Sequence, residues 1–213
     1  MIWKKMSAAV SSLRRGSFVV VVDDTNREDE GDLIIAAEHV TRETLAFMLR
    51  YTSGVVCVAV TEERATELEL PLMVPDNSES QRTAFTVSVD FRYGTTTGIS
   101  AADRSLAIRG LADPGVGAGS FLRPGHVFPL RARPGGVLER RGHTEAAVDL
   151  MEIARLSPAG ALCELTGVDG ALLDRVAVRE FAREHGFPLL SVGDIAAYRR
   201  ATEFCAQVSA RTG

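Results

Sequence analysis

Acidic side chains are concentrated in one short segment near the start of the chain, FVVVVDDTNREDEGD at residues 18–32. Six of the ten residues from 23 to 32 are Asp or Glu. Carboxylates at this density repel one another, and an unpaired buried carboxylate costs several kcal/mol to desolvate. The oxygen atoms of Glu28, Glu30 and Asp32 are the kind of ligand that Mg²⁺ and Mn²⁺ prefer. The segment therefore predicts a divalent metal site, and a solvated acidic turn is the alternative.

A second group of reactive side chains precedes a segment of helical periodicity, in ERRGHTEAAVDLMEIARL at residues 139–156. Thr144 is predicted to be the N-cap of this helix, which places residues 140–143 just before its N-terminus. Unpaired backbone amides and the helix dipole favour an anion there, and Gly142 lets the backbone approach it closely. The two arginines add bidentate pairing to a phosphate. We therefore predict a phosphate site, with His143 either as a metal ligand or as a residue facing solvent.

Three further side chains could pair with an anion or move protons. Arg27 lies inside the acidic run, where its planar fork can hold the carboxylates together or receive a phosphate or an enediolate. His126 lies in a predicted turn directly before a predicted strand at residues 127–130. Glu164 lies among apolar neighbours in a predicted strand at residues 161–166, so it either faces solvent or is held inside. Partial burial would raise its pKa into a range that suits proton transfer.

Composition indicates one domain over residues 1–213, because 213 residues with 46% hydrophobic side chains can bury one sizeable core. Lys and Arg number 24 and Asp and Glu number 28, which gives a net charge of -4. This charge argues against a general binder of nucleic acid or of membrane surfaces and favours a small-molecule partner.

The cysteines indicate a reducing compartment. Cys57, Cys163 and Cys205 are far apart in the sequence and form no CxxC pair, so we expect reduced thiols in a cytoplasmic protein. The sequence has no apolar run of membrane-spanning length, and the N-terminal segment is charged on both sides of too short an apolar stretch for a secretory signal.

The elements that must position these residues alternate between strands and helices, which predicts an α/β fold. The predicted strands are 19–22, 33–37, 55–60, 85–89, 127–130, 161–166 and 189–192. Helices are predicted after the N-cap residues Thr41, Thr61, Ser100 and Thr144, around 178–184 and from 193 onward, and Ser100 is expected to form a capping box with Asp103. Residues 74–82 have turn chemistry and are expected to form a surface loop.

Six motifs, in the same order along the chain, resemble those of the 3,4-dihydroxy-2-butanone 4-phosphate synthases: DDTNREDEGDLIIAAE, TAFTVSVD, TTTGISAADR, RPGHVFPLRA, RRGHTEAAVDL and ALCELTGVDG. The resemblance covers about residues 10–200. Enzymes of this family are lyases that convert ribulose 5-phosphate to a four-carbon ketone phosphate and formate in riboflavin biosynthesis. The resemblance implies the monofunctional form, a three-layer α/β (α+β type) fold around a mixed, twisted central sheet, and a homodimer with active sites near the subunit interface, each completed by the partner.

The resemblance also implies roles for particular residues. Substrate contacts are implied for Arg27, Glu28, Asp32, Arg140, Arg141, Gly142, His143, Thr144 and Glu164. Glu28 and His143 would hold the divalent cations, two Mg²⁺ or Mn²⁺ per active site, and no organic cofactor is expected. His126 and Glu164 match residues that the family needs for proton transfers. Arg82 is a departure, because the family commonly has glycine at this position.

Two other classes of function remain open from the sequence. A different metal-dependent lyase or isomerase of phosphosugars would use the same metal and phosphate sites on another sugar. A non-enzymatic module that binds nucleotides or RNA would keep the scaffold but would need a basic surface, which the net charge of -4 does not favour.

Overall fold

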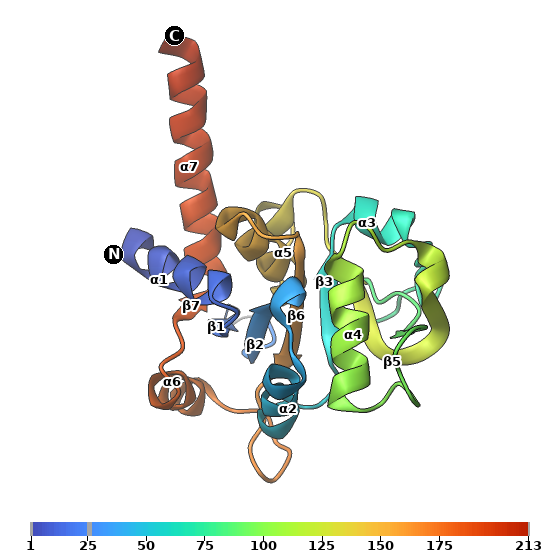
Figure 1. Ribbon diagram of the computed structural model, residues 1–213. Coiled ribbons are helices and arrows are strands. Elements are labelled where there is room, and N and C mark those ends of the chain that lie inside the picture. Colours follow the sequence, from blue (N-terminus) through green and yellow to red (C-terminus); the bar gives the residue numbers. More distant parts are fainter. Residues whose placement is uncertain (1, 25–26, 213) are drawn as a thin grey trace.

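The computed structural model describes residues 2–24 and 27–212, and in this part of the chain seven strands form one mixed sheet (Figure 1). The order of the strands across the sheet is β4-β5-β3-β6-β2-β1-β7. The pairs β1–β7 and β3–β5 are parallel, and the other neighbouring pairs are antiparallel. The strands are β1 (Val19–Val22), β2 (Gly31–Ala36), β3 (Cys57–Val60), β4 (Val89–Phe91), β5 (Phe121–Arg131), β6 (Ala159–Glu164) and β7 (Leu189–Ser191).

The helices cover both faces of the sheet. They are α1 (Ile2–Arg14), α2 (Arg42–Tyr51), α3 (Glu62–Glu67), α4 (Ala101–Ala112), α5 (His143–Ala154), α6 (Arg175–Glu184) and α7 (Val192–Thr212), with short 3-10 helices at Ala37–His39, Ala118–Ser120 and Gly136–Leu138. Side chains of α2, α3, α4 and α6 form one hydrophobic core, and those of α1, α5 and α7 form another. Figure 1 shows α7 extending away from the sheet beyond the rest of the chain.

Consecutive residues of the central strands belong alternately to the two cores, as expected of strands buried on both faces. In β1, Val20 and Val22 join the core beneath α2, α4 and α6, while Val19 and Val21 join the core beneath α5. Strands β2, β3 and β6 alternate in the same way. The three-layer α/β architecture with a mixed sheet is therefore confirmed, and the alternation decides which polar residues at the strand ends face α5.

Most predicted elements are present, with ends shifted by a few residues. Thr41, Thr61 and Ser100 are N-caps whose hydroxyls accept bonds from the backbone, as predicted. The capping box with Asp103 is wrong, because the carboxylate of Asp103 accepts hydrogen bonds from Thr96 and Gly98 instead of reaching back to Ser100. The turn at residues 95–98 is therefore held by the carboxylate of Asp103.

The predicted strand at 85–89 is wrong for most of its length, since only Val89 belongs to a strand. Phe85 bridges Leu130 and Thr86 bridges Leu72, so these neighbouring residues pair with different segments and form no continuous ladder.

The predicted N-cap at Thr144 is also wrong, because the N-cap lies two residues earlier, at Gly142, and α5 begins at His143. Gly142 has the extended backbone of an N-cap, and its carbonyl accepts the first helical bond from Ala146. Thr144 therefore lies inside the first turn of the helix.

The turn predicted around His126 is absent, because β5 runs without interruption from Phe121 to Arg131. Pro124 and Gly125 are residues typical of turns, which is why the sequence predicts one here. Gly125 is instead needed for close packing, since a Cβ there would lie 2.0 Å from the carbonyl carbon of Val89. The glycine permits close packing of β4 against β5 instead of a turn.

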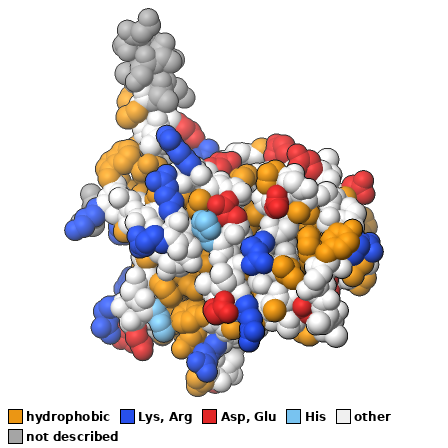
Figure 2. Space-filling model, in the orientation of Figure 1, with side chains coloured by type: hydrophobic (Ala, Val, Ile, Leu, Met, Phe, Trp, Pro, Cys, Tyr) orange, Lys and Arg blue, Asp and Glu red, His pale blue; other side chains and the backbone are white. Residues whose placement is uncertain are grey.

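Within the described residues, no helix is long and apolar enough to cross a membrane. On the face visible in Figure 2, Lys and Arg side chains are interspersed with Asp and Glu side chains.

Candidate active site

The acidic loop between β1 and β2, the first turn of α5 and the end of β6 meet around one pocket of about 280 Å³. The sheet contributes residues from the face that packs against α5. Residues lining the pocket include seven of the predicted or suspected site residues: Arg27, Glu28, Glu30, Asp32, His143, Thr144 and Glu164. Two segments that are more than 100 residues apart in the sequence therefore converge, as the sequence analysis predicted.

Three side chains in this region could hold a cation together. Asp23, Glu28 and His143 each offer one ligand atom, and these atoms all lie within 4.8 Å of one another. The sequence analysis named Glu28 and His143 but not Asp23, which directly follows the buried strand β1 and is itself buried. Two carboxylates and an imidazole form a donor set that suits Mg²⁺ or Mn²⁺.

The environment of His143 leaves one ring nitrogen available as a ligand. The side chain is buried, and Nε2 lies 3.2 Å from the carbonyl oxygen of Val21. A carbonyl oxygen only accepts hydrogen bonds, so Nε2 carries the proton and Nδ1 keeps its lone pair. Burial lowers the pKa of His143, which favours the neutral imidazole that a metal requires.

Asp32 and Glu164 are cross-strand partners in the antiparallel pair β2–β6. Asp32 is buried, and its Oδ1 has no hydrogen-bond partner among the described residues. Burial and the charge of Glu164 raise the pKa of Asp32. A buried carboxyl oxygen without a partner beside a metal-type donor set indicates a site that is shaped for a ligand.

Glu30 is a further titratable group of the pocket, which the sequence analysis named only among the acidic residues of the loop. Partial burial, together with the charges of Glu28 and Asp32, raises the pKa of Glu30 from 4.5 to about 7. A carboxyl group with a pKa in this range can both give and take a proton at neutral pH.

The acidic loop is held by an arginine within the loop, Arg27, and by arginines from other segments of the chain. Arg27 donates from Nη1 to Asp23 Oδ2 at 3.0 Å and also contacts the Glu28 carboxylate. Arg141, just before α5, forms a two-point ion pair with Asp24, with distances of 2.8 and 3.2 Å. Arg141 was predicted to contact the substrate, but it does not line the pocket and instead anchors the start of the loop.

Arg175, at the start of α6, is a second external anchor that the sequence analysis missed. Its Nη2 donates to the backbone carbonyl of Asp23 at 2.6 Å, and its Nε contacts the Asp29 carboxylate. Asp29 has a left-handed backbone with φ of 59° directly after Glu28. Arg175 therefore ties together the two sides of the loop that carries the metal-type donors.

The N-terminus of α5 has the form of an anion site. Gly142 at the N-cap offers no side chain to the first backbone amides. A Cβ there would lie 2.2 Å from Nη1 of Arg140, so the glycine leaves room for the guanidinium to approach the helix terminus. Arg140 donates to Glu145 Oε2 at 2.7 Å and to Thr83 Oγ1 at 2.9 Å, which ties α5 to the loop at 77–83. A phosphate here would meet both the helix terminus and Arg140.

His126 is the one predicted catalytic residue that lies outside this pocket. Its Nδ1 is 2.8 Å from Oδ2 of Asp90, which also accepts a hydrogen bond from the His126 backbone through Oδ1. The carboxylate orients the ring, and the side chain remains 41% exposed. His126 is therefore presented at the surface of the protomer.

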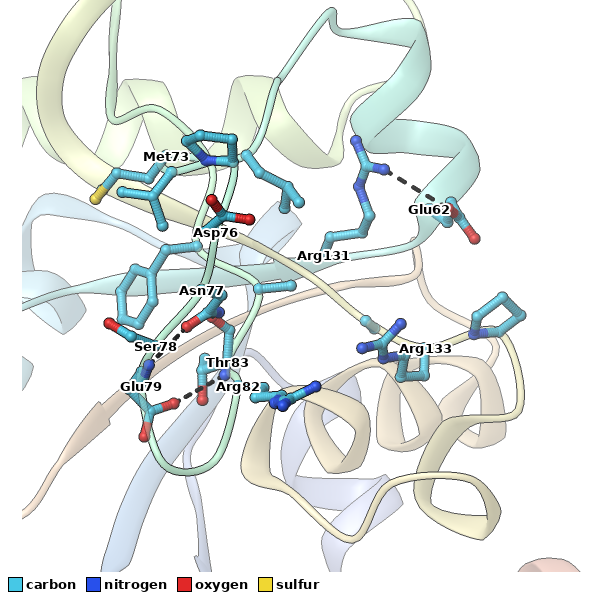
Figure 3. A pocket seen from close by; sticks show the side chains of 17 residues that line it. Glu62, Met73, Asp76, Asn77, Ser78, Glu79, Arg82, Thr83, Arg131 and Arg133 are labelled. Atoms are coloured by element: carbon cyan, nitrogen blue, oxygen red, sulfur yellow. Dashed lines mark hydrogen bonds and ion pairs between the residues drawn. The ribbon is translucent and has the colours of Figure 1, made fainter.

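A larger cavity, of about 650 Å³, shares Glu79, Thr83 and Phe85 with the site pocket and is shown in Figure 3. The carboxylate of Glu79 accepts bonds from the backbone amides of Gln81, at 2.6 Å, and Thr83, at 2.9 Å. Although partial burial opposes ionisation, these backbone bonds lower the pKa of Glu79 to about 2. Glu79 is therefore ionised and fixes the loop between the two cavities through its bonds to Gln81 and Thr83, and it does not act as a proton donor.

Comparison with known proteins decides the family. The family model described as 3,4-dihydroxy-2-butanone 4-phosphate synthase matches residues 7–198. The chain belongs to this family. A 3,4-dihydroxy-2-butanone 4-phosphate synthase of Pelobacter propionicus is 53% identical over 200 residues, which are 94% of this chain and 86% of that protein. The resemblance read from the six motifs is therefore confirmed.

A solved structure of a 3,4-dihydroxy-2-butanone 4-phosphate synthase, in complex with two magnesium ions, aligns with a TM-score of 0.89 and 46% sequence identity. The alignment covers 93% of this chain and 97% of that one. The riboflavin biosynthesis protein RibBA of Salinispora arenicola is 54% identical over 195 residues, which are 92% of this chain and 46% of that protein. The synthase unit therefore also occurs within longer proteins of the family.

Proposed function

We propose that this synthase-family chain converts D-ribulose 5-phosphate to 3,4-dihydroxy-2-butanone 4-phosphate and formate in riboflavin biosynthesis. The observation that carries the proposal is one pocket lined by Glu28, His143, Asp32 and Glu164, in which Glu28 and His143 also form a metal-type group with Asp23. The pocket and the adjoining N-terminus of α5 combine metal-type donors, proton-transfer groups and an anion site.

Glu28 and His143 would hold the divalent cations, with Asp23 as an additional ligand. The donor types fit Mg²⁺ or Mn²⁺, and the relative whose structure contains two magnesium ions supports two cations per active site. When bound, the cations would stabilise the negative charge that develops on adjacent substrate oxygens. No organic cofactor is needed for the proposed reaction.

The remaining residues bind the substrate and move its protons. The phosphate would lie against the backbone of Gly142, His143 and Thr144 at the start of α5, with Arg140 as its counter-charge. Arg27 and Asp32 would contact the sugar oxygens. Glu164 would transfer protons during enolisation, dehydration, skeletal rearrangement and loss of formate, which all require protons to leave or reach oxygen and carbon.

His126 would act in the active site of a second protomer. The resemblance implies a homodimer with sites near the interface, and the exposed ring of His126, oriented by Asp90, is available for such a contact. Exposed apolar side chains on the same and neighbouring segments would be covered in that dimer: Val55, Leu72, Met73, Val74, Tyr93, Ile99 and Leu122. The single domain over residues 1–213 and the cytoplasmic location also remain proposals.

A panel of pentose phosphates with Mg²⁺, scored for formate, tests the proposed activity. We expect formate from ribulose 5-phosphate and loss of turnover when a chelator is added. In assays free of contaminating isomerases, ribose 5-phosphate and xylulose 5-phosphate should give no formate. Turnover of another pentose phosphate without formate would instead identify a different phosphosugar lyase or isomerase.

A further inference from the structure

The segment at residues 52–56, between α2 and β3, runs beside the end of β6. Thr52 forms a bridge with Leu165, and the backbone amide of Ser53 donates to the carbonyl of Glu164 at 2.9 Å. The main chain of Ser53 is therefore fixed relative to Glu164 by bonds that do not involve the serine hydroxyl.

Two other contacts hold the same segment from outside. Arg104, buried on α4, donates from Nη1 to the carbonyl of Gly54 at 3.2 Å. The hydroxyl of Thr52 donates to the carbonyl of Met48, in α2, at 2.7 Å. Since neither contact involves Glu164, the segment keeps its position whatever the state of that carboxylate.

The hydroxyl of Ser53 directs its single proton at Glu164. Its Oγ donates to Oε2 of Glu164 at 2.6 Å, a short bond of the kind that hydroxyls make to carboxylates. The same oxygen accepts from the amide of Val55 at 3.3 Å and lies 3.2 Å from Sγ of Cys163. Burial raises the pKa of the Cys163 thiol to about 11, so the thiol keeps its single proton, which also lies within reach of the carbonyl of Val55, at 3.4 Å, and of Oε2 of Glu164, at 3.8 Å. The hydroxyl oxygen thus accepts from the amide of Val55 and contacts the thiol of Cys163, while its own proton is donated to the carboxylate of Glu164.

We propose that Ser53 is a positioning residue that fixes the rotamer of the Glu164 carboxylate for proton transfer in the active site. The bond to Oε2 holds one carboxylate oxygen, while Oε1 has no hydrogen bond among the described residues and is available to a substrate. Without this bond, Oε2 would keep only the longer contact from Sγ of Cys163, at 3.8 Å, and the carboxylate could rotate about its last torsion, which is broad in glutamate. This inference rests on the proton-transfer role proposed for Glu164.

Steady-state kinetics of Ser53→Ala and Ser53→Thr, with ribulose 5-phosphate and saturating Mg²⁺, test the proposal. A hydrogen bond to a charged group corresponds to a factor of about 10 to 100, so we expect kcat of Ser53→Ala to fall by that factor with KM changed less than about threefold. Ser53→Thr retains the hydroxyl and is expected to keep most of the activity. Thr66→Val is the control, since its hydroxyl donates to the carbonyl of Glu62 within α3, at 2.9 Å, and does not hold the segment at 52–56, so its kcat should stay near that of the unmodified protein.

Glu164 variants separate the failure of this inference from the failure of the proposed function. Full activity of Glu164→Gln would refute the proton-transfer role proposed for Glu164, and with it the role of Ser53. Loss of activity in Glu164→Gln, with normal kcat in Ser53→Ala, would overturn only the role of Ser53. Glu164→Asp withdraws the carboxylate from Ser53, so adding Ser53→Ala to it should lower kcat by less than about threefold. A full additional loss in that double variant, or equal losses in Ser53→Ala and Thr66→Val, would overturn the proposal.

Discussion

Asp32 and Glu164 face each other across the antiparallel strands β2 and β6, on the side of the sheet that packs against α5. Two carboxyl groups in this arrangement cannot both ionise without cost, and burial adds to the effect for Asp32. The raised pKa favours the protonated form of Asp32 in the metal-free protein. The positive charge of a bound divalent cation would favour release of that proton.

The pH dependence of stability in the metal-free protein should report the raised pKa of Glu30, another carboxyl group of the same pocket. Its pKa is about 7 in the folded protein and 4.5 for the free group, so the folded state binds more protons between these pH values. The free energy of unfolding should therefore fall as pH rises from 4.5 to 7 and level off above. Urea unfolding in a chelator at a series of pH values measures this. Glu30→Gln should have a flatter profile, and an unchanged slope in that variant would refute the assignment.

Arg175 should matter for metal affinity although it is not a metal ligand. It ties the Asp23 carbonyl to the Asp29 side chain, on either side of Glu28 in the acidic loop. Arg175→Ala should weaken Mn²⁺ binding about tenfold, since part of a charged hydrogen bond of ~1.5–3 kcal/mol holds the loop in place. Isothermal titration with Mn²⁺ measures the affinity. Arg179→Ala, exposed on the same helix, is the control, and equal losses in the two variants would speak against the anchor.

Mixing two inactive variants tests whether His126 serves the partner's site. A dimer of one His126→Ala chain and one Glu164→Gln chain has both residues intact in one of its two sites if each site is shared between protomers. Randomly re-paired subunits should therefore recover about a quarter of the unmodified rate. If His126 acts within its own protomer, neither site of the mixed dimer is intact and no activity returns. Each variant alone provides the baseline.

Arg82 has a left-handed backbone with φ of 51°, at the position where the family resemblance predicts glycine. A non-glycine residue in this region costs roughly 1–2 kcal/mol, while glycine costs roughly 0.5–1 kcal/mol in backbone entropy. Arg82→Gly should therefore leave the free energy of unfolding unchanged or raise it by up to about 1.5 kcal/mol. Arg82→Ala keeps the Cβ and should not gain stability. Thermal unfolding of both variants decides whether the backbone is the cause.

Local signals in the sequence were enough for most elements of the fold. The valine run at residues 19–22 and the caps Thr41, Thr61 and Ser100 depend on neighbouring residues only, and all four are confirmed. Helix α1 was missed even though Met6, Ala9 and Leu13 carry a helical spacing, because its buried face is evident only once α5 and α7 pack against it.

The site was predicted where a sequence motif carries the chemistry, and it was missed where a contact depends on how distant elements pack. The convergence of Glu28 with His143 followed from motif resemblance and is present in the pocket. The pairing of Asp32 with Glu164 depends on the register between β2 and β6, which no local pattern fixes. The contact of Arg175 with the acidic loop likewise depends on how α6 packs, which no local pattern in the sequence fixes.

Anomalous scattering from crystals grown with Mn²⁺ tests the central claim most directly. We expect manganese peaks within coordination distance of the Glu28 carboxylate and of a ring nitrogen of His143, and loss of these peaks in Glu28→Ala crystals. Manganese bound only at other residues, or unchanged peaks in the Glu28→Ala protein, would contradict the proposal that the acidic loop and α5 hold the cations together.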